Sequence, residues 1–240
     1  MKIKLFTIPN ILTLSNLVCG AIALIEILLY QNFSAAFILI IAAATFDFLD
    51  GMMARLLGQY SEIGRELDSL SDMVSFGVVP SILMFSLFNG AEKSLCSPMW
   101  CEYGAYITLS ILCCSALRLA RFNVDSEQKS VFIGLPTPAN ALFCLSLGLL
   151  VESGKLIISA EWIALISLCM ALLLIAPLRL FALKFENFAW ANNKIRYTFA
   201  LIAATTLLLL REFSIPIIIV IYILMSVIGN ILNRREKIDE

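Results

Sequence analysis

The chain has 240 residues, of which 60% are hydrophobic and 15% are charged, and its mean hydropathy is +0.92. Soluble domains carry about 25% charged residues, so this composition excludes an ordinary soluble domain and indicates an all-α, polytopic transmembrane helix bundle. The formal net charge of −1 gives no basis for a nucleic-acid partner, and the absence of histidine excludes His-liganded metals and a histidine general base.

Apolar segments of about 20 residues are needed to cross the hydrocarbon core as helices, and the chain offers eight candidates. The first directly follows Met1-Lys2-Ile3-Lys4, and we expect it to be retained rather than cleaved as a signal peptide. The third should bend near Gly77 and Pro80. The expected spans are Ile8–Tyr30, Ser34–Leu57, Glu62–Phe88, Glu102–Phe122, Thr137–Val151, Glu161–Leu183, Ile195–Leu210 and Ile215–Leu232.

Positive charges predict the orientation of these spans. With eight spans and a cytoplasmic N-terminus, both termini are cytoplasmic and only Lys93, Lys155 and Arg211 lie outside. The other 14 of the 17 Lys and Arg residues then lie inside, as the positive-inside rule favours. These 14 are Lys2, Lys4, Arg55, Arg65, Arg118, Arg121, Lys129, Arg179, Lys184, Lys194, Arg196, Arg234, Arg235 and Lys237.

Two acidic pairs stand inside the second and third apolar segments. Asp47 and Asp50 are three residues apart, and Asp68 and Asp72 are four apart, so each pair lies on one helix face. At about 1.5 Å per residue, both pairs fall at a similar depth towards the cytoplasmic side. If the two helices are adjacent and antiparallel, the four carboxylates face one cavity.

Carboxylates in a bilayer are costly and mark a functional site by default. Four of them repel one another unless cations lie between them, and their hard oxygen ligands suit Mg²⁺ or Mn²⁺. Charge balance favours two divalent ions, a centre able to accept a bridging diphosphate. Two readings remain open on the residues alone: a two-metal phosphoryl-transfer enzyme, or a divalent-cation or metabolite transporter with an acidic path.

The spacing Asp-x2-Asp-Gly-x2-Ala-Arg-x8-Gly-x3-Asp-x3-Asp, from Asp47 to Asp72, resembles the signature of the CDP-alcohol phosphotransferases, and all eight positions match. The stretches Ser61–Pro80, Arg118–Val124 and Phe132–Pro138 are similar to the bacterial, membrane-embedded phosphatidylserine synthases of this family. The resemblance covers about Ile8 to Ala141. We therefore expect one integral membrane domain over 1–240, with a catalytic core over about 8–152 and additional spans over about 161–232.

The resemblance implies that the chain transfers the phosphatidyl group of CDP-diacylglycerol to L-serine in the bacterial inner membrane, with the active site facing the cytoplasm. It implies catalytic roles for Asp68 and for Asp72, the general base. Its metal ligands would be Asp47, Asp50, Asp68 and Asp72. The CDP-lipid would contact Asn10, Thr13, Gly51, Ala54, Arg55, Ser61 and Gly64.

The acceptor is less narrowly specified by the residues. A serine carboxylate needs a cationic partner, and Arg118, Arg121 and Asn123 are the candidates, although positive-inside anchoring also explains both arginines. The same core would serve glycerol 3-phosphate, choline or inositol phosphate. Cys96 and Cys101 share a loop and pair if that loop faces an oxidising compartment. The sequence leaves a homodimer open.

Overall fold

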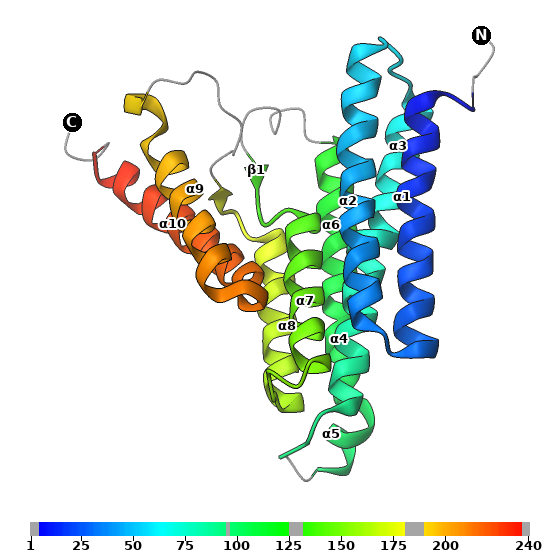
Figure 1. The fold of residues 1–240 in the computed structure, drawn as a ribbon, viewed down its shortest axis with the longest axis vertical. Coiled ribbons are helices and arrows are strands. Elements are labelled where there is room, and N and C mark those ends of the chain that lie inside the picture. Colours follow the sequence, from blue (N-terminus) through cyan, green and yellow to red (C-terminus); the bar gives the residue numbers. More distant parts are fainter. Residues whose placement is uncertain (1–4, 95–96, 125–131, 181–189, 237–240) are drawn as a thin grey trace.

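The computed structural model describes residues 5–94, 97–124, 132–180 and 190–236. Nearly all of them are helical, and the helices run alternately up and down one bundle (Figure 1). The exception is a single antiparallel pair of two-residue strands, β1 (Phe132–Ile133) and β2 (Arg179–Leu180). The prediction of an all-helical bundle is confirmed apart from this pair, which the sequence did not suggest.

The helices follow the expected segments closely, although several contain short π-helical or 3₁₀ stretches. The third segment is interrupted by a π-helical stretch at Met73–Val78, where the bend was expected. In chain order the elements are α1 (Ile8–Ile25) with a π-helical stretch at Glu26–Tyr30, α2 (Phe33–Leu56), α3 (Glu62–Asp72), α4 (Val79–Gly90), α5 (Pro98–Tyr103) with a 3₁₀ stretch at Gly104–Leu109, α6 (Ser110–Val124), α7 (Thr137–Glu152), α8 (Ala160–Ile175), α9 (Trp190–Leu210) with a 3₁₀ turn at Arg211–Phe213, and α10 (Ser214–Glu236).

Five helical stretches are long and apolar enough to cross a membrane: Ile8–Tyr30, Phe33–Leu56, Glu62–Gly90, Pro98–Val124 and Ile195–Gly229. The helices α7 and α8 are apolar but have only 16 residues each. The expected end of the sixth segment at Leu183 is wrong, because α8 stops at Ile175. Ala176 is extended (ψ 142°), as the residue before Pro177 must be, so the helix cannot continue.

Capping residues fix where the site-bearing helices begin. Thr7 caps α1, the side chain of Asn32 accepts from the backbone N–H of Ala35 at the start of α2, and Ser61 caps α3. The turn before α2 is closed by Gln31 in the left-handed region (φ 49°). These starting points set the height of every polar side chain that α1, α2 and α3 carry.

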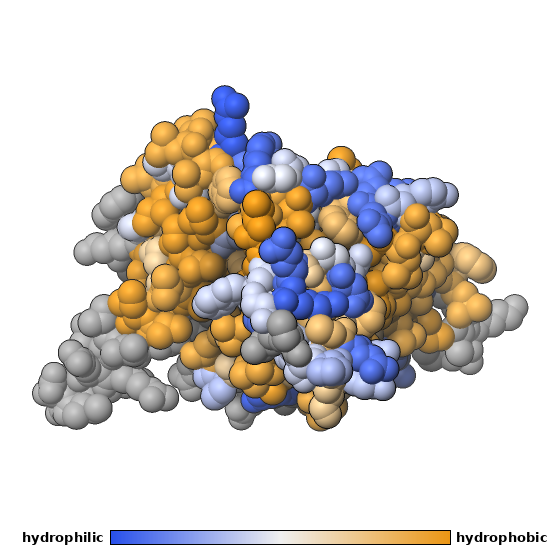
Figure 2. All heavy atoms as spheres, turned by 90° about the horizontal axis from the view of Figure 1, so that it is seen from below, coloured by the Kyte–Doolittle hydropathy of each residue, from blue (hydrophilic) through white to orange (hydrophobic). Residues whose placement is uncertain are grey.

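Apolar packing surrounds these helices without covering them. The core runs between α4, α6, α7 and α8 and includes Phe76, Phe88, Ile111, Leu145 and Ile163, each at most 1% exposed. The pair α9 and α10 leans away from the bundle (Figure 1). Seen from the end that carries α5, hydrophilic side chains gather over the middle while apolar ones cover the flanks, as a lipid-facing bundle requires (Figure 2).

A backbone clasp joins the start of α7 to the end of α8. The N–H of Gly134 donates to the carbonyl of Leu178 and that of Leu135 to the carbonyl of Leu173. Gly134 has φ +81°, and a Cβ there would lie 2.3 Å from the carbonyl oxygen of Leu174. Only glycine fits both demands.

Gly134→Ala should therefore lower the unfolding temperature in detergent by several degrees, since a forbidden φ and a backbone clash together exceed about 1 kcal/mol. Gly154→Ala is the matched control, with φ +69° but no atom within 4 Å of the added Cβ. The two variants can be compared by fluorescence-monitored thermal unfolding. Equal shifts would remove the clash from this explanation.

Candidate active site

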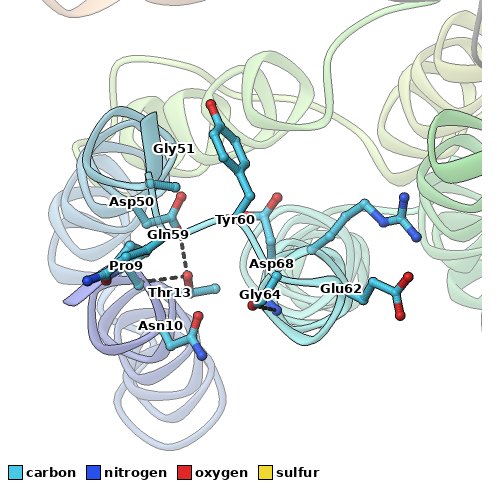
Figure 3. Close-up of a pocket in the computed structure, with 13 residues that line it drawn as sticks. Pro9, Asn10, Thr13, Asp50, Gly51, Gln59, Tyr60, Glu62, Gly64 and Asp68 are labelled. Carbon is cyan, nitrogen blue, oxygen red and sulfur yellow. Dashed lines mark hydrogen bonds between the residues drawn. The ribbon is translucent and has the colours of Figure 1, made fainter. Parts of the chain in front are cut away.

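A cavity of about 520 Å³ opens where α1 begins, α2 ends and α3 begins (Figure 3). This volume lies in the range of small-molecule sites. Residues from all three helices and from the turn between α2 and α3 line it: Pro9, Asn10, Thr13, Asp50, Gly51, Ala54, Gln59, Tyr60, Ser61, Glu62, Gly64, Arg65 and Asp68.

Acidic side chains form a cluster at the inner wall of this cavity. Asp47 and Asp50 come from α2, Asp68 comes from α3, and one carboxylate oxygen of each lies within 4.8 Å of the others. Asp50 is only 6% exposed. The expected meeting of the two acidic segments is thus seen for these three residues, because α2 and α3 run antiparallel beside α1 (Figure 1).

Thr13 holds Asp50 in place from the neighbouring helix. Its hydroxyl donates to Asp50 Oδ2 at 2.5 Å and also lies 3.1 Å from the Pro9 carbonyl oxygen (Figure 3). Thr13 is buried at 3% exposure, and a charge-assisted bond of this length is strong in such surroundings. The sequence assigned Thr13 to the CDP-lipid, but its hydroxyl is directed to the carboxylate.

Asp72 lies one helical turn below Asp68 and has a different partner. Nδ2 of Asn16 donates to Asp72 Oδ1 at 3.2 Å, and the hydroxyl of Ser75 donates to the Asn16 carbonyl at 3.1 Å. The charge of Asp72 also interacts with those of Asp47 and Asp68. The sequence prediction missed Asn16. Its signal was the spacing Asn10, Thr13, Asn16, which puts three polar side chains on one face of an apolar helix.

The N-terminus of α3 forms the opposite wall. The hydroxyl oxygen of Ser61 accepts from the N–H of Gly64 at 2.9 Å, so Ser61 caps the helix and lines the cavity at once. Gly64 brings α3 close to α1, because a Cβ there would lie 3.1 Å from Oδ1 of Asn10. Unsatisfied N–H groups and the helix dipole make this wall attractive to anions.

The remaining predicted contacts divide between the wall and the exterior. Gly51 and Ala54 line the cavity, and a Cβ on Gly51 would meet nothing within 4 Å, so the glycine leaves this wall open. Arg55 is exposed in the last turn of α2 and is not part of the lining. Arg65 lines the cavity instead and lies 3.5 Å from Glu66, a pair that the sequence suggested only as a surface contact.

The three residues assigned to serine lie in different surroundings. Arg118 reaches into the bundle, where its Nη1 donates to Thr137 Oγ1 at 3.3 Å. Arg121 is exposed. Asn123 donates to the hydroxyl of Ser69 at 2.8 Å. Only Arg118 is directed towards the acidic residues, and its charge interacts with that of Asp72. The predicted Cys96–Cys101 pair involves Cys96, which lies outside the described residues.

The acidic cluster fits a divalent cation. Carboxylate oxygens are the hard ligands that Mg²⁺ and Mn²⁺ favour, and three of them converge within 4.8 Å. Asp68 Oδ1 is buried without a hydrogen-bond partner among the described residues. Such an atom is costly in an apolar environment unless a cation or a donor satisfies it. The Thr13–Asp50 hydrogen bond provides the support that a ligating carboxylate requires.

Thr13→Val should weaken Mn²⁺ binding by about tenfold, because it keeps the side-chain shape but removes the donor that orients Asp50. Isothermal titration of the purified protein with Mn²⁺ measures this directly. Thr45→Val is the matched control, since Thr45 lies on α2 and donates only to the Ile41 carbonyl at 2.8 Å. Unchanged affinity in Thr13→Val would exclude the supporting role.

Comparison with known proteins agrees with this geometry. The family model described as CDP-alcohol phosphatidyltransferase matches residues 6–174, which include α1 to α7 and nearly all of α8. The chain is 40% identical over 131 residues to the CDP-diacylglycerol–serine O-phosphatidyltransferase of Bacillus subtilis, and 41% identical over 151 residues to that of Methanocaldococcus jannaschii. It is 35% identical over 152 residues to the protein of that name from Mycobacterium tuberculosis.

These alignments cover most of the site-bearing helices but not whole proteins. They span 55%, 62% and 60% of this chain, and 69%, 64% and 50% of the three relatives. The resemblance seen in the acidic signature is therefore confirmed over the region that builds the cavity. The chain belongs to the CDP-alcohol phosphatidyltransferase family.

Proposed function

We propose that this chain transfers the phosphatidyl group of CDP-diacylglycerol to the hydroxyl of L-serine, giving phosphatidylserine and CMP. Membership of the family and the names of the relatives support this reaction. The observation that carries the proposal is the cavity itself. Its inner wall is the Asp47, Asp50 and Asp68 cluster, and its other wall is the N-terminus of α3.

The diphosphate of the substrate suits the space between these walls. On the α3 side, Ser61, Gly64 and the free N–H groups of the first turn attract phosphate oxygens. On the α2 side, Gly51 and Ala54 leave the wall clear for the nucleotide. Asn10 presents a buried amide to the same space, Thr13 acts by holding Asp50, and Arg55 contributes positive charge from outside the lining.

Asp47, Asp50 and Asp68 would hold Mg²⁺ or Mn²⁺, with Asp72 completing four carboxylates for two ions. When bound, the ions neutralise the carboxylates and stabilise negative charge on the phosphates. The two ions follow from charge balance: four carboxylates bring four negative charges into a membrane interior, and two divalent cations cancel them.

Asp72 acts as the general base in this scheme. It accepts the proton of the serine hydroxyl while the serine oxygen bonds to the phosphorus that carries diacylglycerol. The bond from that phosphorus to the oxygen bridging it to CMP breaks, and CMP leaves with the electron pair. The Asn16 amide fixes the orientation of Asp72 by donating to one oxygen. The described residues include no histidine to compete for this role, since the chain has none.

The orientation we propose has eight spans, both termini in the cytoplasm and the cavity open to the cytoplasm. The three cations expected outside support it, because they share the end opposite the cavity. Nζ of Lys155 lies 2.5 Å from Glu212 Oε2, which joins the α7–α8 turn to the α9–α10 turn. The Ala160 N–H donates to the carbonyl of Glu92, which places Lys93 beside the start of α8. Residues 1–240 then form one integral domain of the bacterial inner membrane.

The proposed activity can be tested with purified protein, CDP-diacylglycerol, Mg²⁺ or Mn²⁺ and labelled alcohols. CMP release should depend on L-serine and yield labelled phosphatidylserine. Glycerol 3-phosphate, choline and inositol phosphate should give no product. Release of CMP with another alcohol but not with serine would keep the family chemistry and reject the acceptor.

A further inference from the structure

A layer of buried polar side chains lies below the acidic cluster, outside the lining of the CDP cavity. Asn16 of α1 donates to Asp72 of α3, the charge of Asp72 interacts with Arg118 of α6, and Arg118 donates to Thr137 of α7. These contacts join four helices through polar groups within an apolar bundle. Asp72, the proposed base, is at the centre of this series.

Asn140 belongs to the same layer. It is three residues after Thr137, on the same face of α7, and is fully buried. The height of α7 is fixed further along, where a Cβ on Gly148 would lie 3.1 Å from the side chain of Leu83. Both helices run in the same direction, so eight residues earlier, about 12 Å, Asn140 lies level with Ser75 (Figure 1). Ser75 is the residue that donates to the Asn16 carbonyl.

Three polar atoms of this layer have no hydrogen-bond partner among the described residues: Asn16 Oδ1, Arg118 Nε and Asn140 Nδ2. Asn16 and Asn140 are both 0% exposed. A buried polar atom left unsatisfied costs about 1–3 kcal/mol, so their presence in one layer indicates a missing polar ligand. The Asn16 amide orientation follows from chemistry, because its NH₂ must face the accepting carboxylate of Asp72, which leaves Oδ1 as the unused acceptor.

The unused atoms have opposite characters at the two sides of Asp72. On the α6–α7 side, Arg118 Nε and Asn140 Nδ2 are donors, and one of them is cationic. On the α1 side, Asn16 Oδ1 is an acceptor. An α-amino acid presents the complement: a carboxylate that accepts and an ammonium that donates, with its hydroxyl between them and within reach of the base.

We propose that Asn16, Arg118 and Asn140 select the acceptor as an α-amino acid. Arg118 and Asn140 donate to its carboxylate, and Asn16 accepts from its ammonium. Neither asparagine was among the residues predicted from the sequence, whereas Arg121 and Asn123, which were, have no such orientation. This inference rests on the proposed transferase activity and adds the residues that define its specificity.

The arrangement explains why an amino alcohol without a carboxylate would be a poor acceptor. Ethanolamine would leave Arg118 Nε and Asn140 Nδ2 unsatisfied in the bundle. Sites built to hydrogen-bond a polar group reject analogues that lack it by about 10⁴-fold or more. L-alanine keeps both recognition groups but has no hydroxyl, so it should bind in competition with serine and not react.

The test compares Asn140→Leu with the wild-type protein in steady-state assays of CMP release. Leucine removes both amide groups at similar volume, so the KM for L-serine should rise at least tenfold. The KM for CDP-diacylglycerol should stay within about twofold, and competitive inhibition by L-alanine should be lost. The unfolding temperature without substrates should not fall, because an unsatisfied buried amide has been replaced by an apolar group. Ser146→Ala is the matched control, since Ser146 is buried on α7 and donates only to the Phe143 carbonyl.

An unchanged KM for serine with inhibition by L-alanine intact would overturn the proposal. If Asn140→Leu is unstable, Asn140→Asp supplies the same test, because a carboxylate at this position repels the substrate carboxylate and should raise the KM for serine further. Wild-type protein that releases CMP without any dependence on serine would instead reject the proposed function, so the two failures are distinct.

Discussion

Asp72→Asn is expected to lower serine-dependent CMP release by about 10²- to 10⁴-fold, the range that a positioned general base contributes. Asparagine keeps the shape of the side chain but cannot accept the hydroxyl proton. Its Oδ1 can still accept from Asn16, so the contact that orients position 72 survives at one oxygen. The variant should therefore remain folded.

Substrate binding separates this prediction from a structural effect. The cavity lining contains Asp68 but not Asp72, so the affinity of Asp72→Asn for CDP-diacylglycerol should change by less than about threefold. Equilibrium binding of the labelled lipid in detergent measures that affinity, and single-turnover release of CMP measures the chemistry. Glu66→Gln is the matched control on α3, because Glu66 is exposed and contacts only Arg65 among the described residues. Wild-type turnover in Asp72→Asn would remove the base from its assigned role.

Much of the fold follows from apolar length and breakers. The first segment matches α1 and its π-helical extension at both ends, Ile8 and Tyr30, because Pro9 marks the start and Asn32 begins the next helix. The sixth segment was extended too far because Leu178, Leu180 and Leu183 are as apolar as a membrane helix. The Pro177 signal was outweighed by that hydropathy, and the β1–β2 pair was invisible in two-residue strands.

The candidate site was predictable where charge is expensive. Four aspartates in apolar helices carry their own signal, and three of them converge as the spacing indicated. Neutral side chains gave no comparable signal. Asn16 and Asn140 resemble ordinary polar residues of membrane helices until their unsatisfied atoms and the Asp72 contact are seen. Arg118, Arg121 and Asn123 share a short stretch, and only tertiary packing separates the buried arginine from its exposed neighbour.

Asp68→Asn is expected to abolish Mn²⁺ binding at the cluster and to lower CMP release by on the order of 10²-fold or more, since a metal ligand provides several kcal/mol of charge stabilisation. Its effect on stability should have the opposite sign. Without divalent ions, Asp47, Asp50 and Asp68 repel one another within 4.8 Å, and Asp68 Oδ1 has no partner among the described residues. Neutralising Asp68 removes part of that repulsion, so the metal-free variant should unfold at a higher temperature than metal-free wild type.

Thermal unfolding with EDTA and with saturating Mn²⁺ distinguishes the two effects. EDTA should lower the unfolding temperature of the wild type by about 2–4 °C for each kcal/mol of binding energy lost, and leave Asp68→Asn unchanged. Glu62→Gln removes a carboxylate from the same cavity and the same helix, but outside the acidic cluster, so it should keep the full Mn²⁺ response. A loss of the Mn²⁺ response in Glu62→Gln equal to that in Asp68→Asn would mean that the cavity binds cations by its overall charge. Retention of the response in Asp68→Asn would place the metal elsewhere. A response confined to chains that keep Asp47, Asp50 and Asp68 makes the cluster both the source of apo-state strain and the site that relieves it.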